Sequence, residues 1–330
     1  MPFVNNNMKK AEIPDVVWEH EKYLFKNHKI FYPPVLKMFA QIKKAYTLAK
    51  ITKALVTKDP DSLIDTVTAE FRGKEIPIDA EVDWAATNEL KKADVINYED
   101  TDEILIGLYE QAATEIGAAE QAALAMTTSF RLANPLVYEQ IRKRAGALIT
   151  DVDSTTRRAV VEMVKQFTEG NYAAGASMPQ LAREIRAGIG MHPTHAKTWW
   201  MDHRRRLIDN GMSGANLAKA SERYAKKLIN YRSRMIARTE MAFAMERGRA
   251  EAWTDAQKKK FLPPNQKKKW YALLDGKTSK ICQALNDTEV GLEEMFYFDE
   301  GLRGAVMGAP AHPFCRSVVI LVRDYDWRRA

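Results

Sequence analysis

The chain has 330 residues, and its apolar share of 46% is ordinary for a globular protein. Such a length favours two or three domains, because single cores stop growing near roughly 250–300 residues. Two cysteines argue against a disulfide framework, and no window approaches the roughly 18 uncharged apolar residues of a membrane span. The N-terminus carries no basic-then-apolar signal pattern, which predicts folding in a cytosol.

The net charge of +7 is distributed unevenly. Residues 1–150 hold 19 Lys and Arg against 22 Asp and Glu, whereas residues 151–330 hold 31 against 21. A basic second half could face nucleic acid or an acidic protein surface, or it could be a solvated basic face. Charge alone favours the solvated face.

The first hundred residues predict short helices and loops. Apolar spacing indicates a helix over residues 35–56, and the turn at residues 59–62 offers Asp61 or Ser62 as a cap for the next helix. A strong helix is predicted over residues 102–126, where Asp102 can cap a segment rich in Ala, Leu and Glu.

Three further helices are predicted in the central region. Pro135 begins a long helix that runs to about Gly170, and Ser177 with Gln180 forms a capping box for a helix over residues 178–189. The longest helix is predicted to begin at Ser213 or Asn216 and to end near Trp253, with a possible break near Asn230. Between these helices, His192, His195 and His203 lack the spacing of a metal motif and are interpreted as solvated loop residues.

The last segment begins with a basic linker and ends in a small α+β unit. Strands are predicted over residues 270–274 and 317–322, a short helix over residues 278–285 and a loop over residues 301–310. The linker supplies candidate DNA contacts, although an ordinary solvated loop has the same composition: Lys258, Lys259, Lys260, Lys267, Lys268 and Lys269.

These elements predict a mainly α fold with a small α+β C-terminal domain and a long helix connecting the two. Three regions are expected along the chain: an N-terminal helical region (1–134), a helical body with the long helix (135–257), and the basic linker with the C-terminal domain (258–330).

Arg238 lies on the apolar seam of the long helix, so its charge must be paired there. Glu240 is only two residues away and points elsewhere on a helix, so both side chains should reach other segments. A structural clamp onto the terminal domain is favoured over catalysis, and our hypothesis pairs Glu240 with Arg316.

Cys282, His312 and Cys315 together provide three soft metal ligands. A zinc site needs a fourth donor, for which Asp275, Asp287 or water is available. A disulfide between the two cysteines and a pair of half-buried thiols are the alternatives, and these two together are favoured over zinc. No phosphate-loop, dinucleotide-binding or nucleophile-elbow motif is present in the sequence.

The order of several short motifs resembles the phage Mu F-like head morphogenesis family, the minor capsid proteins of tailed phages. The similarity covers about residues 135–322. It rests on Glu169-Gly170, Ser177, Leu181-Ala182 and Ile185; on Ile236 to Glu240 with Gly248-Arg249; on Trp270, Asp275, Thr278, Cys282 and Leu285; and on Pro310, His312-Pro313 and Cys315-Arg316. Thr239 lies inside the second of these groups.

The resemblance implies a minor head protein in the virion interior near the portal, assembled in the host cytoplasm. Its partners would be the portal protein, capsid proteins and, non-specifically, DNA. A DNA-binding packaging accessory without portal contact is the alternative, and a metal-dependent hydrolase is a third. The family often has cysteines where this chain has Ser279 and Ser317, which weakens the case for metal.

Overall fold

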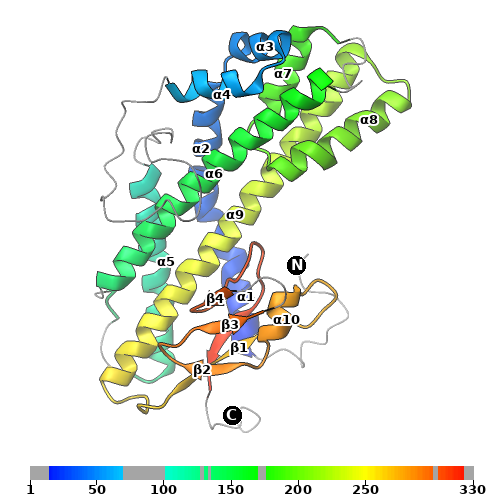
Figure 1. Ribbon diagram of the computed structural model, residues 1–330. Helices are drawn as coiled ribbons and strands as arrows, with labels where there is room; N and C mark the ends of the chain where they lie inside the picture. The colour runs from blue at the N-terminus through cyan, green and yellow to red at the C-terminus, as the bar shows by residue number, and fades with distance from the viewer. Residues whose placement is uncertain are drawn as a thin grey trace. The chain divides into compact units, whose positions relative to one another are not determined.

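The structure is a computed structural model that describes residues 15–69, 101–126, 130–132, 135–169, 176–299 and 304–322 (Figure 1). The chain divides into two compact units. Unit 1 combines Met1–Tyr32, Ile106–Ile141 and Met235–Ala330, and unit 2 combines Pro33–Leu105 and Arg142–Arg234. Each unit draws on distant parts of the sequence, while the division at residues 134 and 257 stays a prediction.

The described residues are mainly helical, with short antiparallel strands near the C-terminus, so the predicted fold class is confirmed. The helical segments are α1 (Asp15–Asn27), η2 (His28–Phe31), α2 (Tyr32–Ala45), α3 (Leu48–Thr57), α4 (Pro60–Ala69), α5 (Thr101–Ala123), α6 (Pro135–Glu169), α7 (Met178–Gly188), a π-helical segment (His195–Trp200), α8 (Met201–Asp209), α9 (Gly214–Lys258) and α10 (Lys280–Leu285). The strands are β1 (Lys267–Tyr271), β2 (Glu289–Gly291), β3 (Phe296–Phe298), β4 (Gly304–Val306) and β5 (Val318–Leu321).

Helix boundaries in unit 2 depend on local capping. The helix predicted over residues 35–56 is in fact two helices, α2 and α3. Thr47 separates them because its side chain accepts a hydrogen bond from the Lys50 amide and so caps the start of α3. The cap of α4 is Asp59, which accepts from the Ser62 amide at 2.9 Å, so the prediction of Asp61 or Ser62 was wrong. The capping box before α7 is confirmed, since Gln180 accepts from the Ser177 amide at 2.8 Å.

The interpretation of the three histidines as solvated loop residues was wrong for two of them. His195 is buried, begins the π-helical segment and stacks on Trp199 with ring centroids 4.4 Å apart. Burial, assisted by His192 and Arg232, lowers the pKa of His195 to about 4. His203 lies in α8 and stacks on Tyr224 at 4.1 Å. These rings pack against other aromatic side chains instead of extending into solvent.

Helix α9 is continuous from Gly214 to Lys258, so it has no break near Asn230. Its second half packs closely against α5 within unit 1. A Cβ atom at Gly248 would lie 1.9 Å from the carbonyl oxygen of Ala113. Ala112 and Ala113 are themselves fully or almost fully buried. The small residues of α5 and this glycine therefore permit an approach that a larger side chain would block.

The C-terminal domain consists of a three-stranded sheet in the order β2-β1-β5 and a separate β3-β4 hairpin. In the sheet Trp270 is opposite Val319. The core of the domain contains Trp270, Cys282, Phe296 and Cys315, and it also takes in Trp253 from the last turns of α9.

Two sequence predictions for this domain need correction. The first strand starts at Lys267, so the second lysine triplet belongs to the sheet instead of a linker. Part of the loop predicted over residues 301–310 is strand β4, whereas residues 301–303 lie outside the described residues. Strands of three residues carry too few alternating positions to stand out in a sequence.

We expect Gly248→Ala to lower the free energy of unfolding by about 1–3 kcal/mol, because the added methyl group overlaps backbone that cannot yield easily. Gly107→Ala in α5 is the matched control, since a Cβ there meets nothing within 4 Å. It should raise stability by about 0.5–1 kcal/mol. Denaturant titrations followed by circular dichroism measure both, and an unchanged Gly248→Ala midpoint would contradict the close α5–α9 contact.

Candidate functional site

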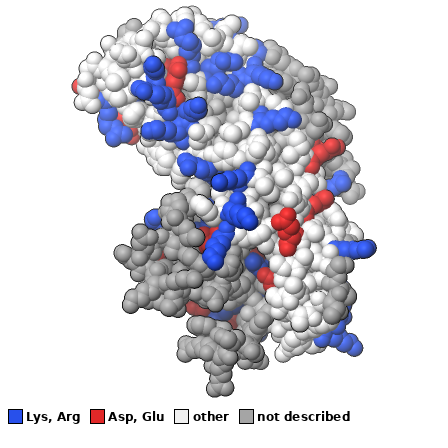
Figure 2. Space-filling model, turned by 180° about the vertical axis from the view of Figure 1, so that it is seen from behind, with Lys and Arg blue, Asp and Glu red and all other residues white. Residues whose placement is uncertain are grey.

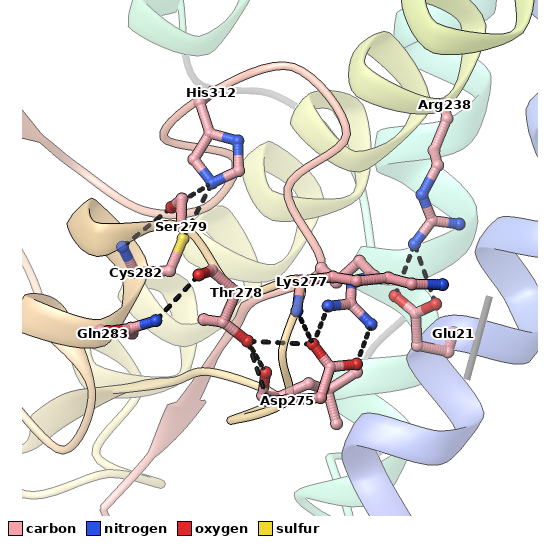
Figure 3. Close-up of polar contacts among 11 residues, drawn as sticks. Glu21, Arg238, Asp275, Lys277, Thr278, Ser279, Cys282, Gln283 and His312 are labelled. Atoms are coloured by element: carbon pink, nitrogen blue, oxygen red, sulfur yellow. Dashed lines mark hydrogen bonds and ion pairs between the residues drawn. The ribbon is translucent and has the colours of Figure 1, made fainter. Parts of the chain in front are cut away.

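The motif residues of the C-terminal part meet in unit 1, where α9, the β1–α10 connection and the turn before β5 come together (Figure 3). The contacts among them link segments that are separated in the sequence. The site is therefore built by tertiary contacts, and its geometry decides what chemistry is open to it.

Arg238 is 4% exposed, and its charge is balanced by Glu21 of α1. Its Nη2 donates to both carboxylate oxygens of Glu21 at 2.8 Å (Figure 3). The expectation that a buried arginine must find a partner on another segment holds. The partner comes from a region to which the sequence assigned no function.

Thr239 and Glu240 connect α9 to two other segments. The Thr239 hydroxyl accepts from the Phe314 amide at 3.2 Å, inside the His312–Arg316 motif. Glu240 accepts from the Tyr109 hydroxyl of α5 at 2.7 Å. Arg316 pairs with Asp275, whereas the hypothesis paired it with Glu240, and that second pair stays a prediction. The hydrogen bond between Thr239 and the Phe314 amide therefore joins α9 to the C-terminal domain.

Asp275 organises the connection between β1 and α10. Arg316 donates to its two carboxylate oxygens, with Nη1 to Oδ2 at 2.7 Å, and the Lys277 amide donates to Oδ1 at 2.9 Å. Thr278 closes the same turn by accepting from the Asp275 amide at 3.0 Å. The pKa of Asp275 falls to about 2, chiefly because Arg316 donates to the carboxylate.

Trp270 packs in the core of the C-terminal domain, and Pro313 contacts the ring of His312 through its carbonyl oxygen. Trp270 is fully buried, with its ring at 5.3 Å from that of Phe296 in an edge-to-face arrangement. The carbonyl oxygen of Pro313 lies 2.9 Å from Nδ1 of His312, so it can accept a hydrogen bond from that nitrogen. This contact leaves Nε2 of His312 facing the two cysteines.

Cys282, His312 and Cys315 lie within reach of one another (the labelled Cys282 and His312 are visible in Figure 3). The Cys282 sulfur is 3.0 Å from His312 Nε2 and 3.6 Å from the Cys315 sulfur. Ser279, the N-cap of α10, places its hydroxyl 2.8 Å from the same nitrogen. Both cysteines are buried and free, which leaves the metal, disulfide and thiol interpretations chemically open.

The electrostatics of the cluster favour one thiolate. Hydrogen bonds from Cys315, and then from His312, Ser279 and Ser317, lower the pKa of Cys282 to about 4 against the opposing effect of burial. The hydrogen bond with Cys282 raises the pKa of His312. The hydrogen bond with Cys282 and burial raise the pKa of Cys315 well above its usual value. A Cys282 thiolate therefore accepts hydrogen bonds from its neighbours.

The two aspartates predicted as alternative zinc donors point to other partners. Asp275 is held by Arg316, and Asp287 lies 3.0 Å from the Lys269 ammonium. Ser279 and Ser317 line the pocket beside the cluster, together with other residues that include Lys277 and Arg316. Both serines thus lie where they can reach the sulfur atoms.

The candidate DNA-contacting lysines do not form one solvated loop. Lys258, Lys259, Lys260 and Lys267 are exposed. Lys268 is 2% exposed and donates to the Met307 carbonyl oxygen at 2.8 Å, so it cannot contact a phosphate group. Lys269 is partly buried and pairs with Asp287.

Sequence reasoning missed Glu21 and Tyr109, which complete the Arg238–Glu240 motif from α1 and α5. Their only signal was that Arg238 on the apolar seam and Glu240 both need partners on other segments. It also missed the contact of Ser279 with His312, although the helix-capping position of a serine before Lys280 could have placed it.

Residues 201–320 match the family model described as Phage Mu protein F like protein. The resemblance inferred from the motifs is confirmed over this region, whereas residues 135–200 lie outside the match. No curated protein and no solved structure matches the chain. Among the described residues, no helix combines the length and apolar character needed to cross a membrane.

We expect Asp275→Asn to lower the free energy of unfolding at pH 7 by about 2 kcal/mol, because Arg316 loses its ionised partner. A folded-state pKa of about 2 lies below the ordinary value of 3.8. The contribution is therefore present above about pH 4 and is lost as the pH falls towards 2. Denaturation curves of both proteins at pH 7 and pH 2 should converge on acidification.

Asp287→Asn is the control for this prediction, because the Asp287 side chain is 63% exposed. Surface pairs of this kind contribute about 0–1 kcal/mol. A difference between Asp275→Asn and the unaltered protein that persists unchanged at pH 2 would show that the carboxylate charge is not the cause.

Proposed function

We propose that the protein is a minor capsid, or head morphogenesis, protein of a tailed phage. It would act in head assembly, associated with the portal and the capsid interior, after folding in the host cytoplasm. The observation that carries this proposal is the match of residues 201–320 to the Mu F-like family. That region includes the whole of α9 and almost all of the C-terminal domain.

The contacts of the site support a structural role over a metal-dependent hydrolase. Arg238, Glu240, Asp275 and Arg316 are engaged with protein partners that hold segments together. Cys282 and Cys315 are only 2% and 3% exposed, so a metal ion held by them would be poorly accessible to a substrate. An assembly protein needs such a fixed domain together with an exposed surface for its partner.

The C-terminal domain exposes apolar side chains that suit a protein partner. Tyr297 is 75% exposed, Leu274 56% and Phe261 49%. Aromatic side chains such as Tyr297 and Phe261 are enriched in protein interfaces. We assign the portal contact to this domain because these residues lie within the matched region.

Co-expression with the portal protein of the same phage, followed by size-exclusion chromatography, tests the proposal. The protein should elute with the portal assembly, and Tyr297→Ser combined with Leu274→Ser should abolish co-elution because the apolar contact is lost. Val56→Ser is the control, since Val56 is 64% exposed but lies in unit 2. Clean separation of the unaltered protein from the portal would contradict the proposal, and co-elution of the double variant would contradict the assigned surface.

A second function, contact with DNA, is supported by a basic surface on unit 2. Residues 195–234 are described throughout and hold ten Lys and Arg against three Asp and Glu. The exposed bases are Lys197, Arg205, Arg206, Lys219, Arg223, Lys226, Lys227 and Arg234, and the exposed acid is Asp209. Figure 2 shows blue side chains gathered at the end of this face that corresponds to α7 and α8 in Figure 1.

We expect the full-length protein to bind random-sequence duplex DNA with an affinity that falls with salt, since phosphate contacts release counterions. Lys226→Glu with Lys227→Glu should reduce the slope of log affinity against log salt by about two. Lys258→Glu with Lys259→Glu, in the basic segment at the end of α9, is the matched control. Fluorescence anisotropy at several salt concentrations measures the slope for both variants. An equal reduction of the slope in the control would contradict the assignment of the DNA contact to the basic surface of unit 2.

A further inference from the structure

We propose that Cys282, His312 and Cys315 form a binding site for one Zn²⁺ ion, with the fourth position at Ser279 or a water molecule beside it. The site stands apart from portal or DNA binding, and its test does not depend on either. The argument rests on the spacing of the three ligand atoms, the groups that orient them and the donor available to complete the shell.

The three ligand atoms already have nearly the spacing that zinc requires. All lie within 4.8 Å of one another, with the two sulfurs 3.6 Å apart and Cys282 Sγ 3.0 Å from His312 Nε2. Zinc–sulfur bonds of about 2.3 Å and zinc–nitrogen bonds of about 2.0 Å in a tetrahedron place two sulfurs about 3.8 Å apart and sulfur and nitrogen about 3.5 Å apart. The third pair, the Cys315 sulfur and His312 Nε2, lies within 4.8 Å. Side-chain shifts on the order of 1 Å would therefore admit the ion.

Groups behind the ligands orient them as metal sites require. Nδ1 of His312 lies 2.9 Å from the Pro313 carbonyl oxygen, which fixes the tautomer that offers Nε2 to the sulfurs. Backbone amides of Ala311 and Ser317 donate to the Cys315 sulfur. The Cys315 amide donates to the His312 carbonyl oxygen at 3.1 Å, closing a turn that holds both side chains in place.

The fourth zinc ligand would be Ser279 or a water molecule. Ser279 Oγ is 2.8 Å from His312 Nε2, on the pocket that Ser317 also lines. The carboxylate of Asp275 is held by Arg316, and Asp287 is held by Lys269, so neither competes for this position. A serine oxygen or water would complete four-coordination, and a cysteine at position 279 would complete it better because thiolate is a stronger zinc ligand.

Cobalt titration of the full chain under reducing conditions tests the site, because Co²⁺ takes the zinc geometry and thiolate ligands give it a strong charge-transfer band. One Co²⁺ per chain should bind and be displaced by Zn²⁺. Cys315→Ser should abolish the band. Ser279→Cys should intensify the band and tighten the affinity by at least about tenfold. Asp287→Asn should change nothing.

Circular dichroism of each variant separates loss of the site from loss of the fold, and the gain expected for Ser279→Cys cannot arise from misfolding. No stoichiometric Co²⁺ or Zn²⁺ binding by the unaltered, folded and reduced protein would overturn the proposal. Binding that survives Cys315→Ser, or that is weakened by Asp287→Asn, would show a metal bound elsewhere. A Cys282–Cys315 disulfide that forms quantitatively in air even with excess zinc would also overturn it.

Discussion

The buried arginines of α9 impose the constraint on which the rest of the structure depends. Arg232, Arg238 and Arg249 are each at most 4% exposed. A guanidinium group keeps its charge in a protein, so each must be matched by acceptors on another segment. Removing one partner of such a buried pair typically costs about 3–5 kcal/mol. The path of the chain around α9 is therefore fixed by polar contacts as much as by apolar packing.

Each arginine satisfies this constraint differently. In unit 2, Arg232 donates to the Thr156 hydroxyl and to the backbone oxygens of Gly190 and Met191. In unit 1, Arg238 uses the Glu21 carboxylate, and Arg249 pairs with Glu120 at 2.8 Å and Glu246 at 3.3 Å. Glu21 and Glu120 lie outside the matched residues 201–320. The N-terminal segments of this chain thus complete the charges of its Mu F-like region.

Sequence patterns were sufficient where the physical signal is local. The long helical periods of α5, α6 and α9, the Ser177–Gln180 capping box and the need to pair Arg238 could all be read from neighbouring residues. The choice of partner could not, because Glu21 is separated from Arg238 by more than 200 positions. The three-residue strands and the burial of Lys268 were missed for the same reason, since both depend on contacts made after folding.

The C-terminal domain is too small to depend on its own core. Its strands are three to five residues long, and its apolar cluster is completed by Trp253 and Ala256 of α9. Domains of this size need additional links, because the buried apolar area barely offsets the entropy of ordering the chain. Here the links are Thr239 to the Phe314 amide, Asp275 to Arg316, and the cluster of Cys282 with His312 and Cys315. All of them hold the turn before β5, so this turn is where α9, the sheet and the soft-ligand cluster depend on one another.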